Sequence, residues 1–379
     1  MLGLYLHIPF CAAICNYCNF NRGLLNRELK GRYVDALIRD IEGVADPART
    51  SRPPERADTV YLGGGTPSLL SQDELSSILA ACRGAFDLAP DVEITLEANP
   101  ETVTEGTLAG FRAAGVNRVS IGVQSFRDDE LKRLSRAHDA GRARRALADA
   151  RSAGFDNVSL DLMMWLPGQA VDDWLESVDA AIDAEPDHVS LYMLEVYPNA
   201  PLKDEMARRE WSQAPDDDVA AMYVAGMERF EAAGFMQYEI SNVARPGRES
   251  RHNLKYWTDG EWAGFGCGAH STRRGERWQN VASTEDYIAR VVAGRSPGIK
   301  KQSLTVDQRI GDALFTGLRL NTGVDVKAIN ARYATDIGLR YGTELEPFVE
   351  LGLLEVSPER WRLTRQGLLL AHEVMAVFV

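Results

Sequence analysis

The segment "LGLYLHIPFCAAICNYCNF", residues 2–20, joins a short apolar strand to a group of three cysteines. Cys11, Cys15 and Cys18 follow the spacing C-x3-C-x2-C and make up three of the five cysteines in the chain. An odd, clustered number is typical of an intracellular metal site and not of a secreted disulfide framework. Thiolates bind both zinc and iron–sulfur clusters, so spacing alone leaves both open. A structural zinc would need a fourth ligand nearby, and His7, on the preceding strand, is an awkward one.

The segments after the cysteines alternate between short apolar runs and helix-length amphipathic stretches. Strands are expected at 2–8, 57–65, 92–99, 118–125, 157–165 and 188–196. Six strands alternating with helices predict a parallel sheet covered by helices, either open or curled into a barrel. Glycine and polar residues gather where these strands end, at Gly63–Thr66, Glu97, Gln124 and Asp161. Since parallel α/β folds bind ligands at that edge, the sequence predicts a site there.

The rest of the chain divides into an extension, a linker and a small domain. We expect a core with its extension over residues 1–293, a linker over 294–303 ("GRSPGIKKQS") and a C-terminal domain over 304–379. The order of short helices, a hairpin turning at 357–360 and a last helix resembles a winged helix. Residues 300–379 carry ten Lys or Arg and ten Asp or Glu, so this segment lacks the basic stripe of a DNA-binding version.

Composition limits the classes of partner. The chain has 379 residues and a formal net charge of −13, which opposes general attraction to nucleic acid or to an anionic membrane surface. No apolar run approaches the roughly 18 residues of a membrane span, and the start of the chain is too short for a signal peptide. We therefore expect a cytoplasmic protein with no integral membrane segment and no nucleic-acid partner.

Several motifs identify a family. Tyr17 precedes Cys18 in the pattern of radical S-adenosylmethionine (SAM) proteins, and the motifs "LYLHIPFC", "YLGGGTPSLL", "RVSIGVQSF" and "DLMMWLPGQ" follow in order. Together they resemble the radical SAM subgroup that contains the oxygen-independent coproporphyrinogen III dehydrogenases (HemN) and the HemW-like heme chaperones. The resemblance implies a partial (β/α)6 TIM-like barrel followed by a HemN C-terminal domain. It also implies a [4Fe–4S] cluster on the three cysteines, whose fourth iron is free to bind SAM.

The same resemblance assigns positions that contact the cofactor. They are Tyr5, Tyr17, Gly64, Gly65, Thr66, Glu97, Gln124, Arg136 and Asp161. Carboxylates can accept hydrogen bonds from the ammonium or ribose of SAM, and Arg136 can donate a fork to a carboxylate; otherwise Arg136 is a solvated helix residue. Trp165 departs from the family's usual small residue, which puts the packing of adenine or substrate there in doubt.

A second motif, "HNLKYW" at 252–257, resembles one associated with heme binding in HemW-like proteins. His252 would ligate heme iron, and Tyr256 and Trp257 would pack on the porphyrin. Alternatively, the motif is a loop whose polar groups satisfy the backbone and whose aromatics close the barrel. His270 is a weaker candidate, and Cys267 beside it is expected to be a packing residue.

The favoured function is that of a HemW-like heme chaperone that binds the cluster, SAM and heme. Phe20 stands where the dehydrogenases carry a further cysteine, so coproporphyrinogen III oxidase activity is not expected. Heme-accepting apoproteins of respiratory or cytochrome type are the expected partners, with flavodoxin or ferredoxin as electron donor. The alternatives are a coproporphyrinogen III dehydrogenase of porphyrin biosynthesis and a radical SAM methyltransferase or cyclopropane-forming enzyme.

Overall fold

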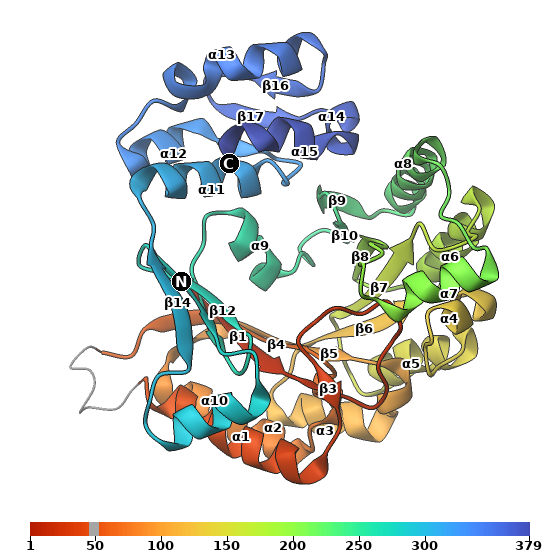
Figure 1. The fold of residues 1–379 in the computed structure, drawn as a ribbon, viewed down its shortest axis with the longest axis vertical. Coiled ribbons are helices and arrows are strands. Elements are labelled where there is room, and N and C mark those ends of the chain that lie inside the picture. The colour runs from red at the N-terminus through yellow and green to blue at the C-terminus, as the bar shows by residue number, and fades with distance from the viewer. Residues whose placement is uncertain (45–52) are drawn as a thin grey trace.

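The computed structural model describes residues 1–44 and 53–379 and is built around one large sheet (Figure 1). Six strands of this sheet pair in parallel and in chain order. They are β1 (Leu2–Ile8), β4 (Arg56–Gly64), β5 (Asp87–Ala98), β6 (Arg118–Gln124), β7 (Val158–Met164) and β8 (His188–Met193). Their order is open and curved, which confirms the expected partial barrel.

Helices between these strands cover the outer face of the sheet. They are α1 (Arg27–Glu42), α2 (Gln72–Ala85), α3 (Glu105–Ala114), α4 (Asp128–Arg133), α5 (Ala140–Ser152) and α6 (Val171–Asp183), with the short turns η1 (Pro67–Leu69) and η2 (Pro100–Thr102). Two of these helices begin at capping residues: the side chain of Asn26 accepts from Leu29 N–H, and Ser71 forms a capping box with Glu74. Cys82 is completely buried in α2.

The sheet continues beyond both ends of this parallel core. Next to β1 lie the parallel β11 (Trp262–Phe265) and then the antiparallel β12 (His270–Arg273), β13 (Glu276–Asn280) and β14 (Gly298–Ser303). Next to β8 lie β10 (Asn242–Ala244) and β9 (Met236–Glu239), reached through α7 (Pro201–Arg209) and α8 (Asp216–Ala232). Helix α10 (Thr284–Val292) precedes β14. Residues 298–303, expected in a linker, thus form an edge strand, whose exposed lysines suit a sheet edge.

A separate small domain follows β14. It contains α11 (Val306–Gly317), β15 (Val324–Asp325), α12 (Val326–Tyr333), α13 (Ile337–Glu350), β16 (Leu354–Val356), β17 (Arg360–Leu363), α14 (Arg365–Leu369), α15 (Ala371–Met375) and η3 (Ala376–Phe378). The expected hairpin is present, since β16 and β17 pair antiparallel and Ser357 N–H donates to Arg360 O at 3.0 Å. Its hydrophobic core, with Leu314, Ile337 and Val374 fully buried, is distinct from that of the barrel.

Helix α9 (Arg251–Trp257), formed by the "HNLKYW" motif, lies between the sheet and the small domain (Figure 1). Its first N–H groups donate to the carboxylate of Glu93 on β5, at 3.0 Å from Arg251 and 3.1 Å from His252. At its other end, the Trp257 ring lies 4.3 Å below the guanidinium of Arg319, which follows α11. The helix therefore connects the barrel to the C-terminal domain. In the described part of the chain, no helix combines the length and apolarity that crossing a bilayer demands.

Candidate functional site

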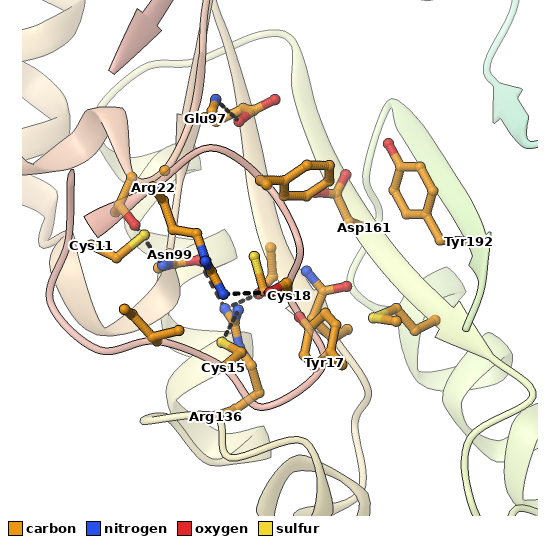
Figure 2. A pocket seen from close by; sticks show the side chains of 18 of the residues that line it. Cys11, Cys15, Tyr17, Cys18, Arg22, Glu97, Asn99, Arg136, Asp161 and Tyr192 are labelled. Atoms are coloured by element: carbon orange, nitrogen blue, oxygen red, sulfur yellow. Dashed lines mark hydrogen bonds between the residues drawn. The ribbon is translucent and has the colours of Figure 1, made fainter. Parts of the chain in front are cut away.

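The carboxyl ends of the parallel strands surround a cavity of about 340 Å³ (Figure 2). All three cysteines of the cluster line it, together with most of the residues expected to contact the cofactor. The members of that set are Tyr17, Gly64, Gly65, Thr66, Glu97, Gln124, Arg136 and Asp161. The fold thus brings into one place residues that are up to 150 positions apart (Cys11 to Asp161) in the sequence.

The cysteine loop is fixed at both ends and in the middle. Strands β2 (Phe10–Cys11) and β3 (Gly23–Leu24) pair in parallel and close its base. Within the loop, the side-chain amide of Asn16 donates to Arg133 O at 2.8 Å and to Glu205 at 2.7 Å. Cys18 N–H donates to Cys15 O at 3.2 Å, and Cys18 O accepts from Arg22. These contacts hold the three free thiols against the same cavity.

The donor set suits an iron–sulfur cluster. Two cations face the thiols, since Arg136 Nη1 lies 3.5 Å from Cys15 Sγ and Arg22 is close enough to act on Cys11. The Nε atoms of both arginines are buried without a hydrogen-bond partner among the described residues, so each keeps a donor for an added group. In residues 1–44 and 53–379, no three His, Cys, Asp or Glu side chains meet closely enough to hold a single metal ion. Three thiols around one cavity suit separate irons of a cluster better than one zinc ion. The anionic thiolates that a cluster requires would be stabilised by the two arginines.

The glycines at the end of β4 are required by the packing of the protein itself. A Cβ on Gly65 would lie 2.7 Å from Phe10 O and 2.9 Å from Ile8 O, both backbone atoms. Gly64 has φ +113°, and a Cβ there would lie 2.5 Å from the His7 ring. Gly65 and Thr66 also donate their N–H groups to Ile8 O and Phe10 O, at 2.8 and 2.7 Å. Close approach to the cysteine strand, and not only to a ligand, therefore excludes side chains here.

Two carboxylates lie deep in the cavity. Burial raises the pKa of Glu97 to about 7, although its hydrogen bond from Tyr61 (2.7 Å) opposes the shift and the nearby Asp161 adds to it. Burial likewise raises the pKa of Asp161 to about 6, against a hydrogen bond from Ser120 at 3.2 Å. Both groups would be stabilised as anions by a cationic ligand.

Arg136 and Gln124 complete this wall. Arg136 Nη2 donates to Asn99 Oδ1 and to Gly122 O, both at 2.8 Å, so this arginine faces the cavity and is not the solvated helix residue of the alternative interpretation. Gln124 occupies a left-handed conformation (φ 69°) at the end of β6, which turns its side chain into the cavity lining. Tyr17 lies beside Arg136 (Figure 2).

Several residues that line the cavity were not predicted from the sequence, among them Asn99 and Tyr192. Asn99 bridges Arg136 and Thr66, to whose Oγ1 it donates at 3.0 Å, and Tyr192 extends from β8 toward Asp161 (Figure 2). Asn99 directly follows β5, and its position after a buried run was the available signal, whereas Tyr192 lies on β8, for whose end no site residue is predicted. Glu195 also lines the cavity, where its carboxylate accepts from Tyr197 at 2.6 Å.

His252 lies away from this cavity and is 1% exposed. Its Nδ1 pairs with Thr59 Oγ1 at 2.8 Å and its Nε2 with Tyr256 O–H at 3.0 Å. The ring also stacks on Tyr61, with centroids 5.1 Å apart. Both ring nitrogens thus have protein partners, and in this conformation His252 offers no free nitrogen to a heme iron. The alternative interpretation also differs from the structure, because the motif forms helix α9 and not a loop, and His252 pairs with side chains and not with the backbone.

Three further positions differ from, or refine, expectation. Tyr5, expected at the SAM site, lines a second, adjoining cavity and shares a hydrogen bond with His7 at 3.0 Å. Trp165 has φ 64° and donates from Nε1 to Ala214 O at 2.8 Å, away from the first cavity. Glycine is favoured at such a backbone conformation, so Trp165 is a conformational exception, and it does not line the first cavity. Cys267 is fully buried, as a packing residue would be.

Comparison with known proteins agrees with this geometry. The model of the radical SAM superfamily matches residues 5–181, and that of the HemN C-terminal domain matches residues 304–370. The heme chaperone HemW of Bacillus subtilis is 35% identical, over 100% of this chain and 99% of the relative. HemW of Mycobacterium tuberculosis strain H37Rv is 40% identical, over 98% and 93%. The mitochondrial radical S-adenosyl methionine domain-containing protein 1 of Bos taurus is 36% identical, over 97% and 81%.

One solved structure shares the entire fold. Coproporphyrinogen III oxidase (HemN) from Escherichia coli, described as a radical SAM enzyme, superposes with a TM-score of 0.86 at 23% identity. The match covers 100% of this chain and 89% of that one. At this identity the likeness establishes the architecture, including the C-terminal domain, and says nothing about the reaction.

Proposed function

Because this chain belongs to the radical SAM superfamily, in the group of the heme chaperone HemW, we propose that it binds a [4Fe–4S] cluster, SAM and heme and delivers heme to other proteins. The observation that carries the proposal is identity of 35–40% to HemW proteins over at least 98% of this chain. Phe20 supports it. This residue is 64% exposed at the mouth of the first cavity, where it brings no thiol to a position at which the dehydrogenases have one.

The chain's own residues would divide the work of holding the cofactors. Cys11, Cys15 and Cys18 would ligate the cluster, which when bound supplies one electron to the sulfonium of SAM. Glu97 and Asp161 would accept hydrogen bonds from the cationic and hydroxyl groups of SAM. Arg136, already fixed by Asn99 and Gly122, would donate its unpaired Nε–H to the carboxylate of SAM.

The partners follow from the same proposal. Apoproteins of respiratory or cytochrome type would receive the heme, and a flavodoxin or ferredoxin would reduce the cluster. We place this activity in the cytoplasm.

A second candidate function, coproporphyrinogen III dehydrogenase, is favoured only by the shared architecture with HemN. One anaerobic experiment separates the two. Reconstituted protein is incubated with heme and then with an apo-cytochrome, and in parallel with coproporphyrinogen III, SAM and a strong reductant. The proposal expects a Soret band that passes to the recipient and no release of carbon dioxide. Decarboxylation without heme uptake would reject the chaperone and restore the dehydrogenase.

A further inference from the structure

A second cavity of about 550 Å³ adjoins the first. Phe20, Gly64 and Glu97 line both, so the two share a wall. The second cavity opens between the cysteine loop and the strands β11–β13, and its volume falls in the range of pockets that bind organic cofactors.

His270, the first residue of β12, faces this cavity. Its backbone is fixed, because His270 O accepts from Trp262 Nε1 at 3.1 Å and the residue pairs with Gln279 on β13. Its side chain is exposed, and the described residues supply no hydrogen bond to its ring nitrogens. This separates it from His252 and from His7, whose Nε2 pairs with Asn21 O at 2.7 Å. Of these three histidines, His270 alone presents a free imidazole nitrogen to a cavity.

The surroundings of His270 favour an anionic, flat ligand. Partial desolvation of the exposed ring, together with the positive charges of Lys300 and Arg277, lowers the pKa of His270, so the imidazole is neutral and keeps a lone pair. The same two cations would lie near carboxylates carried by a ligand bound to this histidine.

One part of the cavity lining is aromatic, beside polar residues such as Asn21 and Gln279. Tyr256 and Trp262 pack edge to face with centroids 4.7 Å apart, and Tyr5 lines the same cavity. On the side of the cysteine loop, Phe20 exposes most of its ring. Extended aromatic surface of this kind binds a porphyrin face well.

We propose that this second cavity binds an iron porphyrin, with His270 as the axial ligand of the iron and Lys300 and Arg277 near its propionates. The inference rests on the proposed function and changes its iron ligand from His252 to His270. Since Phe20 and Glu97 belong to both cavities, the porphyrin would lie directly beside SAM.

The test is a titration of anaerobically reconstituted protein with ferric heme, followed by the Soret band and by electron paramagnetic resonance of the iron. His270→Ala should weaken heme binding about tenfold or more and shift the band, because the iron loses its nitrogen ligand. Added imidazole should restore the band of the wild type. Iron-free protoporphyrin IX, followed by fluorescence, should bind His270→Ala and wild type alike. His372→Ala, which removes a histidine whose side chain is 76% exposed in the C-terminal domain, is the matched control.

Three other outcomes of this titration would separate a failure of the inference from a failure of the proposed function. If wild type takes up heme and His270→Ala keeps both its affinity and its spectrum, the inference is overturned while the proposed function stands. If His252→Ala or, should that variant not fold, His252→Gln loses the axial ligand while His270→Ala retains it, the iron ligand is His252. If wild type takes up no heme, the proposed function and the inference fail together.

Discussion

Arg319 is the side chain whose loss should most weaken the junction between barrel and C-terminal domain. Its Nη2 and Nε contact Oε2 of Glu239 at 2.9 and 3.2 Å, and its guanidinium lies over Trp257. Glu239 is fully buried, whereas the Arg319 side chain remains 24% exposed. In Arg319→Met, the carboxylate would stay buried with only Ser241 N–H and the Asn242 amide as donors.

Two effects determine how much Arg319→Met lowers the free energy of unfolding. Breaking a buried ion pair from one side costs about 3–5 kcal/mol, because a charge is left without compensation. Partial exposure of Arg319 lets water reach that side, so we expect the lower end, about 3 kcal/mol. Glu239→Gln removes the charge itself, so in its background Arg319→Met should cost about 2 kcal/mol less than in wild type.

The assay is urea unfolding of cluster-loaded protein, followed by circular dichroism and by tryptophan fluorescence. Two probes are needed because the barrel and the small domain have separate cores and need not unfold together. Arg362→Met is the matched control, since its partner Glu355 is 55% exposed, and it should change the free energy of unfolding by no more than about 0.5 kcal/mol. Equal losses in Arg319→Met and Arg362→Met, or strict additivity with Glu239→Gln, would refute the reasoning.

Three other predictions address the first cavity. Replacing Cys11, Cys15 and Cys18 together by Ala should abolish the brown absorbance and the binding of about four irons, and stoichiometric zinc in wild type would contradict the cluster. Gly65→Val should lower the free energy of unfolding by about 1–3 kcal/mol, because its Cβ would lie 2.7 Å from the Phe10 backbone. The variant should also hold less iron–sulfur cluster and bind SAM more weakly by calorimetry. Unchanged iron content and stability would show that the strand carrying Phe10 moves freely. Since the pKa of Glu97 rises from 4.5 to about 7, the folded state binds the extra proton between these values, and stability should fall as pH rises through that window. In Glu97→Gln, the free energy of unfolding should fall by on the order of 2 kcal/mol less than in wild type between about pH 5 and pH 8. If the variant loses stability with pH as steeply as wild type does, the raised pKa of Glu97 is contradicted.

The parallel core and the edge that carries the site could be predicted from the sequence. Alternation of strand and helix is a local pattern, and the C-terminal ends of parallel strands necessarily share an edge. The spacing of Cys11, Cys15 and Cys18 is likewise local, and the structure places all three against one cavity. The resemblance to the family added Arg136, whose partners are Asn99, directly after β5, and Gly122 on β6.

The orientation of side chains on α9 could not be predicted in this way. A histidine next to aromatics is compatible with a ligand site and with packing, and the choice depends on Thr59, which lies 193 residues earlier. The Gly, Pro and Ser residues of 294–303 predict a linker, whereas pairing with β13 makes 298–303 a strand. The cavity that His270 lines is formed by three strands and the cysteine loop, so no local sequence pattern predicts it.

Helix α9 is a short, direct connection between the barrel and the C-terminal domain. Its seven residues span about 10 Å, from the carboxylate of Glu93 in the barrel wall to the ring of Trp257 beneath Arg319. A helix of two turns held at both ends moves as a rigid body, so a shift of the C-terminal domain cannot be absorbed along its length. His252 on this helix stacks on Tyr61 and meets Tyr256 edge to face, and Tyr256 also lines the second cavity. We therefore expect a displacement of the C-terminal domain to move Tyr256 in the wall of the second cavity.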